Sequence, residues 1–435
     1  MHKDVPYERI TGLPFVQVQE RKESPTPEFV DRVWEGSGYG ARRDRRPFRY
    51  QAFVPDPIRD WDGPLAGRAA EAVAAATAAV RELQSAGAGH DLETLAAPLL
   101  RSEALGSSFI EGLRASNKRL ALAAYEPLAA DVTARAVLGN VRAMEQAVHI
   151  GTAQERFRVD DLLDIHHTLL EGTSEERYAG VVRSGQNWIG GRGLSPIDAT
   201  FIPPPEDRVG ELLDDLVAFV NLADLPAIAQ AAIAHAQFET IHPFGDGNGR
   251  AGRCLIHVIL RRRGLAPLLV PPVSVVLATN ARRYITGLVD FREGRTDDWI
   301  GIFADAIAAS AAAATRLRTQ IDTLVDDLID RAGSPRSDSV ARKIIRSLPV
   351  QPVVSADTAA AQHGVTPTAA RAALNRLEET GVLVPTRVGR RRDREWISDE
   401  LFQLLDAFEH DLGQSGDSDA ARPAPPPTRP PRQQG

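Results

Sequence analysis

A long run with helical spacing, from Pro64 to about Ala332, constrains the fold of this chain most. Its segments, such as AAEAVAAATAAVRELQ and DDLLDIHHTLLEG, are rich in Ala and Leu and repeat their apolar residues with the period of a helix. We therefore expect a mainly α protein. Residues 178–205 interrupt the run, because Gly and Pro surround a short β-prone stretch there. This pattern predicts a short β-hairpin flap between helices.

The flanking regions indicate the domain organisation. Residues 1–65 are rich in Pro, Gly and aromatic residues without a sustained period, so we expect an irregular arm packed on a helical core of residues 66–332. Gly333-Ser334-Pro335 is typical of a linker, and a smaller domain is expected over residues 335–410. The tail 413–435 has too few apolar residues to fold and is predicted to be disordered.

The composition narrows the class of protein. The 435 residues are 43% hydrophobic and 25% charged with a net charge of −7, which is typical of a globular protein of two or three domains. A single cysteine forms no internal disulfide, and the first ten residues lack an apolar signal sequence. The apolar stretch 302–314 is short and contains Asp305. We therefore expect a cytoplasmic protein that does not span a membrane.

The segment HAQFETIHPFGDGNGRAGR, residues 235–253, contains the densest group of chemically active residues. Its small residues let successive backbone N–H groups turn inward as an anion-binding nest, and the helix that follows adds its positive N-terminal end. Two arginines supply charged donors at the same place. The sequence therefore predicts a site for a di- or triphosphate. The residues of this site are Gly245, Asp246, Gly247, Asn248, Gly249, Arg250 and Arg253.

Two residues of this segment suggest a reaction. Asp246 is the natural ligand for Mg²⁺, which proteins hold with few carboxylates and with substrate phosphates. His242 lies at the edge of the loop, where its imidazole can take a proton near neutral pH. We expect His242 to deprotonate a hydroxyl group, which then attacks a phosphorus atom held by the loop.

A zinc site is the main alternative for the same segment. His235, Glu239 and His242 are spaced i, i+4 and i+7 and could share a helical face. Pro243 directly follows His242 and disfavours helical geometry there, which disrupts the third ligand. We therefore expect His235 to be a buried, hydrogen-bonded histidine and Cys254 to be a small core residue.

Residues 242–253 resemble, position for position, the HxFx(D/E)GNGRxxR signature of Fic-domain protein adenylyltransferases. The resemblance continues in the flap, where GxxRxxQNWIGG occupies residues 180–191, and covers most of residues 65–310. It implies an all-α Fic core that transfers AMP from ATP to a Ser, Thr or Tyr hydroxyl of a target protein. Relatives that phosphorylate instead carry Lys where this chain has Gly249, so AMP transfer is favoured here.

The resemblance also implies roles for individual residues. His242 would be the base, Asp246 the Mg²⁺ ligand, and Arg253 the γ-phosphate ligand. Many relatives have a Tyr in the adenine pocket where we align Val276, and either Asn280 or Tyr284 could contact the base instead. The loop residues implied to bind nucleotide are Phe244, Gly245, Asp246, Gly247, Asn248, Gly249 and Arg250. The flap residues implied to bind the target backbone by strand addition are Gln186, Asn187, Trp188, Ile189 and Gly190.

A second match lies upstream, where SSFIEG at Ser107–Gly112 resembles the (S/T)xxxE(G/N) inhibitory motif of the same family. We expect an inhibitory helix over about residues 97–113. Ser107 and Glu111 are one helical turn apart, and Gly112 allows the helix to end near the active site. The Glu111 carboxylate would pair with Arg253 and occupy the space of the γ-phosphate. Relatives with this Glu can also remove AMP from a target.

Residues 335–396 carry eleven Lys and Arg against six Asp and Glu, a local charge of +5. Two short helices, a third opened by Thr366-Pro367 and an arginine-rich hairpin resemble a winged helix-turn-helix. Two functions stay open: an autoinhibited enzyme whose module recruits a target or forms a homodimer, and a DNA-binding regulator that keeps a Fic core as a nucleotide sensor. The tentative DNA contacts are Thr368, Arg371, Arg390, Arg391 and Arg392.

Overall fold

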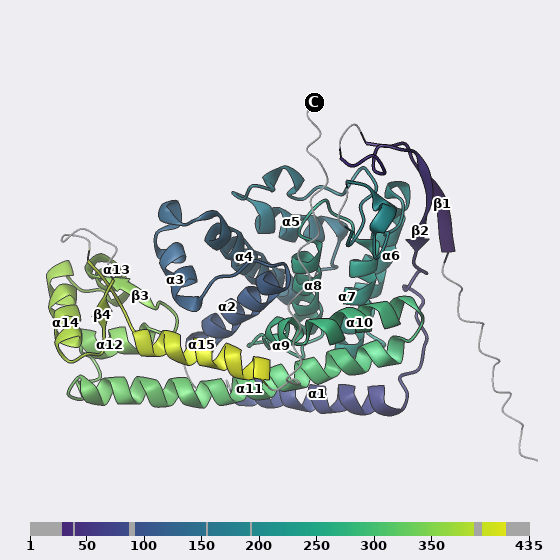
Figure 1. The fold of residues 1–435 in the computed structure, drawn as a ribbon. Coiled ribbons are helices and arrows are strands. Elements are labelled where there is room, and N and C mark those ends of the chain that lie inside the picture. The colour runs from purple at the N-terminus through teal and green to yellow at the C-terminus, as the bar shows by residue number, and fades with distance from the viewer. Residues whose placement is uncertain are drawn as a thin grey trace, which may run out of the picture.

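The computed structural model describes residues 28–37, 40–86, 92–153, 155–191, 194–386 and 394–414. Helices dominate these residues, which confirms the expected mainly α fold (Figure 1). The helices of the core are α1 (Gly67–Ala86), α2 (Leu92–Ile110), α3 (Asn117–Tyr125), α4 (Val132–Thr152), α5 (Val159–Leu170), α6 (Val209–Val220), α7 (Ala227–Ile241), α8 (Asn248–Arg262), α9 (Val273–Thr279), α10 (Ala281–Arg292) and α11 (Thr296–Arg331).

Helices α7 and α8 form the centre of the core. Almost every residue of both helices is buried, so neither has a solvent-facing side. Small residues in α7, such as those of AQAAIAHA, allow close packing, and α8 is packed between α4 and α7. The chain that joins α7 to α8 therefore emerges from the best-packed part of the protein, which is a rigid support for a functional loop.

Helix α11 is the longest helix and lies along α1 in the lower layer of Figure 1. By length and composition alone it could cross a membrane, but 56% of its most apolar window is buried within this structure. It packs on α1, α7, α9 and α10. Burial of this kind is what a core helix of a folded domain shows, and the expectation of a protein without a membrane span stays a prediction.

The N-terminal arm is not irregular as expected, because it contains a two-stranded antiparallel hairpin of β1 (Glu28–Trp34) and β2 (Phe48–Val54). Aromatic residues face each other across the strands: Phe29 lies opposite Phe53, and Trp34 lies opposite Phe48. Cross-strand aromatic pairs stabilise such a ribbon. Each strand has only seven residues, too few to give a clear period between the surrounding Gly and Pro. Residues 1–27 lie outside the described part.

The flap is a folded loop rather than the predicted hairpin. In its described residues the pairing is limited to isolated bridges, Ile189 with Phe201 and Val182 with Phe244. Gly190 and Gly191 have φ angles of 79° and 81°, and prolines follow at 203–205, so a regular ladder cannot extend. The flap joins the arm as well, because Phe53 N–H donates to the carbonyl of Ile202 at 2.9 Å.

The C-terminal module, residues 335–414, follows the predicted order of elements. Thr366 caps its third helix by accepting from Ala369 N–H at 3.2 Å, as its sequence predicts. The wing residues 387–393 lie outside the described part, so the winged-helix assignment stays a prediction. The elements are α12 (Val340–Ser347), β3 (Val353–Ser355), α13 (Ala356–His363), α14 (Pro367–Glu379), β4 (Val384–Pro385), β5 (Glu395–Ile397) and α15 (Asp399–Gln414), with an antiparallel sheet in the order β3-β5-β4.

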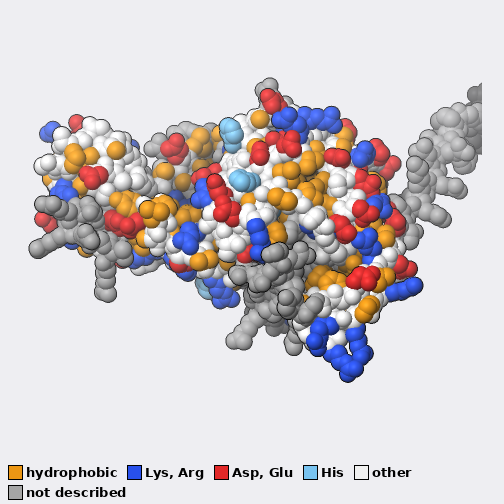
Figure 2. All heavy atoms as spheres, turned by 90° about the horizontal axis from the view of Figure 1, so that it is seen from above, with side chains coloured by type: hydrophobic (Ala, Val, Ile, Leu, Met, Phe, Trp, Pro, Cys, Tyr) orange, Lys and Arg blue, Asp and Glu red, His pale blue; other side chains and the backbone are white. Residues whose placement is uncertain are grey.

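Helix α15 returns from this module to the core, where it packs on α2, α3, α9 and α11 (Figure 1). The tail after Gln414 lies outside the described residues. Seen from above, the surface mixes acidic, basic and apolar side chains, in keeping with a small net charge (Figure 2). The module is thus attached to the core at both ends, through α11 before it and α15 after it.

Candidate active site

The loop between α7 and α8 is held in shape by its own side chains. His242 ends α7 in the left-handed conformation, with φ 50° and ψ 60°, so the chain leaves the helix there as Pro243 predicts. Asn248 then closes the loop, because its Oδ1 accepts from Phe244 N–H at 2.8 Å and its Nδ2 donates to the Phe244 carbonyl at 2.9 Å. Asn248, expected to bind phosphate, here fixes the loop.

His242 is held as a neutral imidazole. Its backbone carbonyl accepts from Arg183 Nε at 2.9 Å and from Asn187 Nδ2 at 3.1 Å. Its Nδ1 is buried and has no hydrogen-bond partner among the described residues. Burial, together with the nearby charge of Arg183, lowers the pKa of His242 to about 4. The ring is therefore deprotonated at neutral pH and able to accept a proton.

His166 of α5 is a site residue that sequence reasoning missed. Its ring stacks on Phe244 with centroids 3.6 Å apart and planes 2° apart. Its Nδ1 accepts from Gly180 N–H at 3.1 Å, so its Nε2 carries the proton and donates to the Asp246 carbonyl at 2.9 Å. Burial lowers the pKa of His166 to about 4, which preserves this tautomer. One ring thus ties the start of the flap to the loop.

Asp246 and Arg250 place opposite charges at the loop. Asp246 Oδ1 accepts from Gly247 N–H at 2.5 Å and lies 3.5 Å from Arg250 Nη2. Burial raises the pKa of the Asp246 carboxyl, against the effect of Arg250. The Arg250 Nε is buried without a partner in the described part of the chain. The Asp246 carboxylate can bind a cation, and the Arg250 guanidinium can donate from its Nε to an acceptor. Together they fit a phosphate that carries a bound metal ion.

Arg253 meets the upstream motif as predicted. Its Nη2 donates to Glu111 Oε1 at 2.8 Å and to the Ser107 carbonyl at 2.9 Å, and its Nε donates to Ser107 Oγ at 2.9 Å. Arg253 is 1% exposed, whereas the Glu111 side chain is 30% exposed. Burial would raise the pKa of Glu111, but Arg253 outweighs it and keeps this pKa below its ordinary value.

The end of α2 brings Glu111 to this position. The helix runs from Leu92 to Ile110, so it begins before the expected residue 97 despite Pro98, and it ends just ahead of Glu111. Gly112 turns the chain away with φ 80°. A Cβ atom added to Gly249 would lie 2.1 Å from Glu111 Oε1 and 2.9 Å from Arg253 Nη1. The carboxylate therefore fills the space directly over the start of α8.

The flap residues divide into two groups. Gln186 and Asn187 point inward: their amides donate to the carbonyls of Pro203 at 2.8 Å and of Phe244 at 3.1 Å. Trp188 packs edge-on against Trp34, with ring centroids 5.7 Å apart. Ile189 uses its backbone groups on Thr200 and Phe201. The backbone of Ile189 is therefore already paired, and a target strand would have to pair with Trp188 and Gly190 on either side of it. Strand addition stays a prediction.

Three further predicted positions are resolved by their contacts. His235 is buried, and its Nε2 lies 2.8 Å from the hydroxyl of Tyr284, which is itself only 4% exposed. Tyr284 is therefore a buried residue, and an adenine contact through Tyr284 or Asn280 stays a prediction. Asn280 lies at the junction of α9 and α10, where its Nδ2 is 3.4 Å from the Val276 carbonyl. The buried Cys254 confirms the expected core residue.

The zinc alternative is not supported. Among the described residues no three His, Cys, Asp or Glu side chains form a group that could hold a metal. Glu239 is nonetheless notable, because its Oε1 is buried without a described partner and burial raises its pKa to about 7. It lies close to Gly252, since a Cβ atom there would be 2.8 Å from this oxygen. The site thus contains a third carboxyl group besides those of Glu111 and Asp246.

Comparison with known proteins agrees with this geometry. Residues 156–260 match the model of the Fic/DOC family, and residues 70–149 match the model of the Fic/DOC family N-terminal region. This part of the chain belongs to the Fic/DOC family. The signature loop of the Fic domain, its central helices and the helix α2 before it all lie within the two matched regions.

Several proteins resemble this Fic domain in sequence. Protein adenylyltransferase fic-1 of Caenorhabditis elegans is 32% identical over 141 residues, which are 32% of this chain and 26% of that protein. The probable protein adenylyltransferase aq_aa38 of Aquifex aeolicus is 37% identical over 97 residues, 22% of this chain and 28% of that protein. The chain thus spans about a quarter of the length of these curated relatives.

Solved structures of Fic proteins are also similar to this chain. A Fic family protein from Desulfovibrio desulfuricans G20 has 21% sequence identity and a TM-score of 0.48, over 79% of this chain and 98% of that one. A fragment of Fic-1 from C. elegans has 21% identity and a TM-score of 0.44, over 58% of this chain and 73% of that one.

Proposed function

We propose that this protein is an adenylyltransferase that moves AMP from ATP to a Ser, Thr or Tyr hydroxyl of a target protein and is inhibited by Glu111. The observation that carries the proposal is that a neutral, half-buried His242 lies at one loop with the buried Arg250 and Arg253. A base for a hydroxyl and donors for a polyphosphate are the two requirements of this reaction. The curated relatives that bear the name protein adenylyltransferase add support.

The transfer needs one proton movement and one displacement. A ring nitrogen of His242 takes the proton from the target hydroxyl, and the oxygen attacks the α-phosphorus of ATP. The bond from that phosphorus to the bridging oxygen of the β-phosphate breaks, and pyrophosphate leaves. Loop N–H groups at the start of α8 and the guanidinium groups of Arg250 and Arg253 stabilise the negative charge of the phosphates.

A magnesium ion fits the residues present. Asp246 is the carboxylate that would hold it, because its side chain lies at the loop and stays 39% exposed. One carboxylate is enough for Mg²⁺, since substrate phosphates and water complete its ligands. When bound, the ion would neutralise charge on the leaving phosphates.

Inhibition follows from competition for Arg253. With Glu111 in place, the guanidinium is already neutralised, and the γ-phosphate would meet a carboxylate. ATP would then bind with its α-phosphorus out of line, and a misplacement of about 1 Å can cost roughly a hundredfold in rate. The same carboxylate could orient water for the removal of AMP from a modified target, so the two directions belong to one site.

The test compares variants of the full chain for incorporation of α-labelled ATP into protein. Glu111→Gly should raise incorporation about a hundredfold, mainly in kcat, because Arg253 is freed. Glu111→Gly with Arg253→Ala should lose this gain. Glu111→Gly with His242→Ala should abolish transfer while isothermal titration still detects ATP. The proposal fails if Glu111→Gly transfers no AMP or if loss of His242 leaves the rate unchanged.

DNA binding through residues 335–396 stays a prediction. Thr368 and Arg371 lie exposed on α14, as a DNA-reading helix requires, whereas Arg390, Arg391 and Arg392 lie outside the described residues. Charge reversal of Arg371 in the full chain should weaken a salt-sensitive gel shift with duplex DNA. An unchanged shift would leave the module without a DNA contact at this helix.

A further inference from the structure

The C-terminal module holds the helix whose end carries Glu111. Arg101 of α2 reaches across to the module and donates to two backbone carbonyls, of Pro349 at 2.5 Å and of Val350 at 3.0 Å. Burial lowers the pKa of Arg101 to about 10, against the effect of the nearby Glu145 carboxylate, so its charge is kept at neutral pH. Two hydrogen bonds from a charged group make this contact stronger than one between neutral groups.

The next residue of α2 makes a second contact, with helix α15 of the module. Ser102 is buried, and its Oγ donates to Glu409 Oε1 at 2.8 Å. Asn117, just past the inhibitory motif, donates to the same oxygen at 3.0 Å and to Asp406 Oδ1 at 3.0 Å. Residues on both sides of Glu111 in sequence are thus bonded to one helix of the module.

Helix α2 is also fixed to the core between these contacts and Glu111, for example at Glu103 and Gly106. Glu103 lies 2.8 Å from the His257 ring and accepts from Ser274 N–H at 2.7 Å. Gly106 crosses the backbone of α9 so closely that a Cβ atom would lie 2.6 Å from Val275 N. These contacts make the crossing with α9 the point about which α2 can tilt. They also limit how far Glu111 moves when the contacts between α2 and the module are broken.

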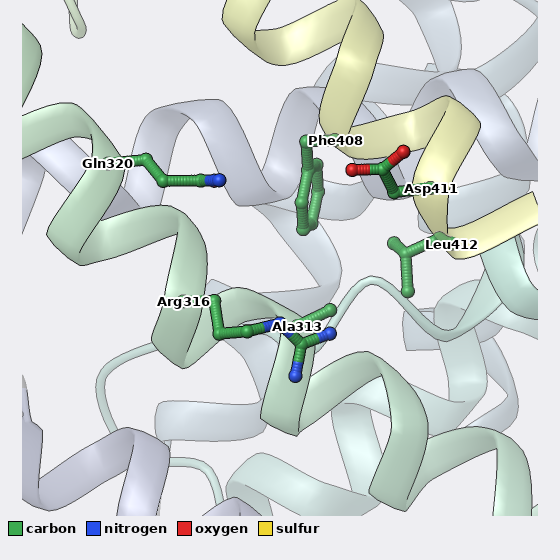
Figure 3. Close-up of a pocket in the computed structure, with 6 residues that line it drawn as sticks. All are labelled: Ala313, Arg316, Gln320, Phe408, Asp411 and Leu412. Atoms are coloured by element: carbon green, nitrogen blue, oxygen red, sulfur yellow. The ribbon is translucent and has the colours of Figure 1, made fainter. Parts of the chain in front are cut away.

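The packing of α15 on α11 is incomplete by contrast. A cavity of about 70 Å³ lies between the two helices, lined by Ala313, Arg316, Gln320, Phe408, Asp411 and Leu412 (Figure 3). Arg316, Gln320 and Asp411 are exposed, so this cavity opens to solvent. The polar bonds from α15 to Ser102 and Asn117 add to the contacts that attach α15 to the core on its buried side.

We propose that residues 335–414 have a further function as the regulatory module of this enzyme, in which Arg101 and Ser102 are positioning residues that hold Glu111 against Arg253. The proposal rests on the adenylyltransferase function proposed above. Ser102 lies in α2, which ends at Ile110 directly before Glu111, so a tilt of the module-bound side of this helix moves the carboxylate. Whatever displaces α15 then weakens inhibition, and coupling between sites usually amounts to about fivefold or more.

The experiment uses variants of the full chain and labelled ATP, with self-modification and total lysate protein as acceptors. Arg101→Met with Ser102→Ala removes the contacts of α2 with the module. Lys118→Met is the matched control, because its Nζ lies 2.8 Å from Asp399 of α15 but on α3 rather than α2. We expect the first variant to raise kcat at least about fivefold with little change in the KM for ATP, and the control to stay within about twofold of wild type.

A second arm tests whether the effect passes through Glu111. In the Glu111→Gly background the Arg101→Met and Ser102→Ala changes should add no further rate, since the group they position is gone. An added gain there would overturn the proposal. If the double change lowers the melting temperature too far, Ser102→Ala alone, which removes one hydroxyl, should give a smaller rise of the same sign.

The outcomes separate this proposal from the one on which it rests. If Glu111→Gly is activated and the α2 variants stay at the wild-type rate, the regulatory role is wrong and the adenylyltransferase stands. If Glu111→Gly itself transfers no AMP, the proposed function fails. Equal activation by Lys118→Met would show general loosening of α15 rather than positioning by Arg101 and Ser102, and would overturn the assignment of these residues.

Discussion

The phosphate loop, residues 242–249, and the inhibitory segment, Ser107–Gly112, meet at Arg253 but are held in different ways. The loop is bonded from within by Asn248 and from behind by His166 and Arg183. Glu111 has one ion pair with Arg253 and a side chain that is 30% exposed. The loop is therefore held in a fixed position, whereas the Glu111 side chain can leave Arg253 by breaking one ion pair.

The environment of Arg253 lowers the free-energy cost of losing the ion pair with Glu111. A buried charge that loses its partner is usually strongly destabilising. Here Ser107 supplies two further acceptors to Arg253, its hydroxyl and its carbonyl. The guanidinium therefore keeps hydrogen bonds during the exchange of a carboxylate for a phosphate. The catalytic geometry is thus preorganised, and only the group that pairs with Arg253, a carboxylate or a phosphate, is exchanged.

The largest effect is expected from breaking the loop. Asn248→Ala removes both bonds to Phe244 and should lower kcat about a hundredfold in the Glu111→Gly background, because the loop no longer holds the phosphates in line. Labelled ATP measures this rate. Asn248→Asp keeps the acceptor for Phe244 N–H and loses the donor, so it should fall between the two. An unchanged kcat for Asn248→Ala would show that the loop is held by its surroundings alone.

A smaller loss is expected at the back of the loop. His166→Phe keeps the ring stacked on Phe244 but removes the bonds to Gly180 and Asp246, and should lower kcat about tenfold for the loss of two hydrogen bonds. The exposed neighbour supplies the control, since His167→Phe should have no such effect. Equal rates for the two variants in the Glu111→Gly background would count against a role for His166.

A gain is expected from crowding the inhibitory segment. Gly249→Ala places a methyl group 2.1 Å from the present position of Glu111 Oε1, and the exposed end of that side chain must move. We expect a rise in kcat of about fivefold, smaller than that of Glu111→Gly, because the methyl group also approaches Arg253. In the Glu111→Gly background the same change should give no rise. A rise there would mean that the methyl group acts on the loop instead.

The smallest effect concerns pH. The pKa of His242 is lowered to about 4, so the base stays deprotonated from pH 5.5 to 7.5, and kcat of Glu111→Gly should change less than about twofold. A histidine with an ordinary pKa would lose about tenfold over this range. Glu111 raises this pKa, so its removal moves the inflection lower still. Glu239→Gln is the control, because the pKa of Glu239 is raised to about 7. A fall that persists in this control would contradict the lowered pKa of His242.

Local sequence predicted the parts of the site that lie close together in the chain or share a motif. The loop, the end of the helix at His242 and the meeting of Glu111 with Arg253 follow from short patterns. His166 could not be found in this way, because a single His on an apolar helix has no local mark of its partners, and Gly180 and Asp246 reach it only in the folded chain. Its place on the buried face of α5 was the one available signal.

The fold shows the same limit. Helices were predicted because their period extends over many residues, as in α1 and α5. The hairpin of β1 and β2 was missed because it is stabilised by pairs of residues on different strands, such as Trp34 with Phe48, and not by a pattern within either strand. The contacts of Arg101 and Ser102 with the C-terminal module join residues about 250 and 300 positions apart, and no pattern within either segment indicates them.

The bare backbone at Gly249 also has a meaning for how such sequences can drift. The space above it is large enough for one group, whether a side chain at this position or the carboxylate of Glu111. A lineage that gains a side chain at position 249 loses the room for its inhibitor, and selection then no longer maintains the acidic residue at position 111. The two positions, 138 residues apart, should therefore vary together among descendants and be inherited as one character.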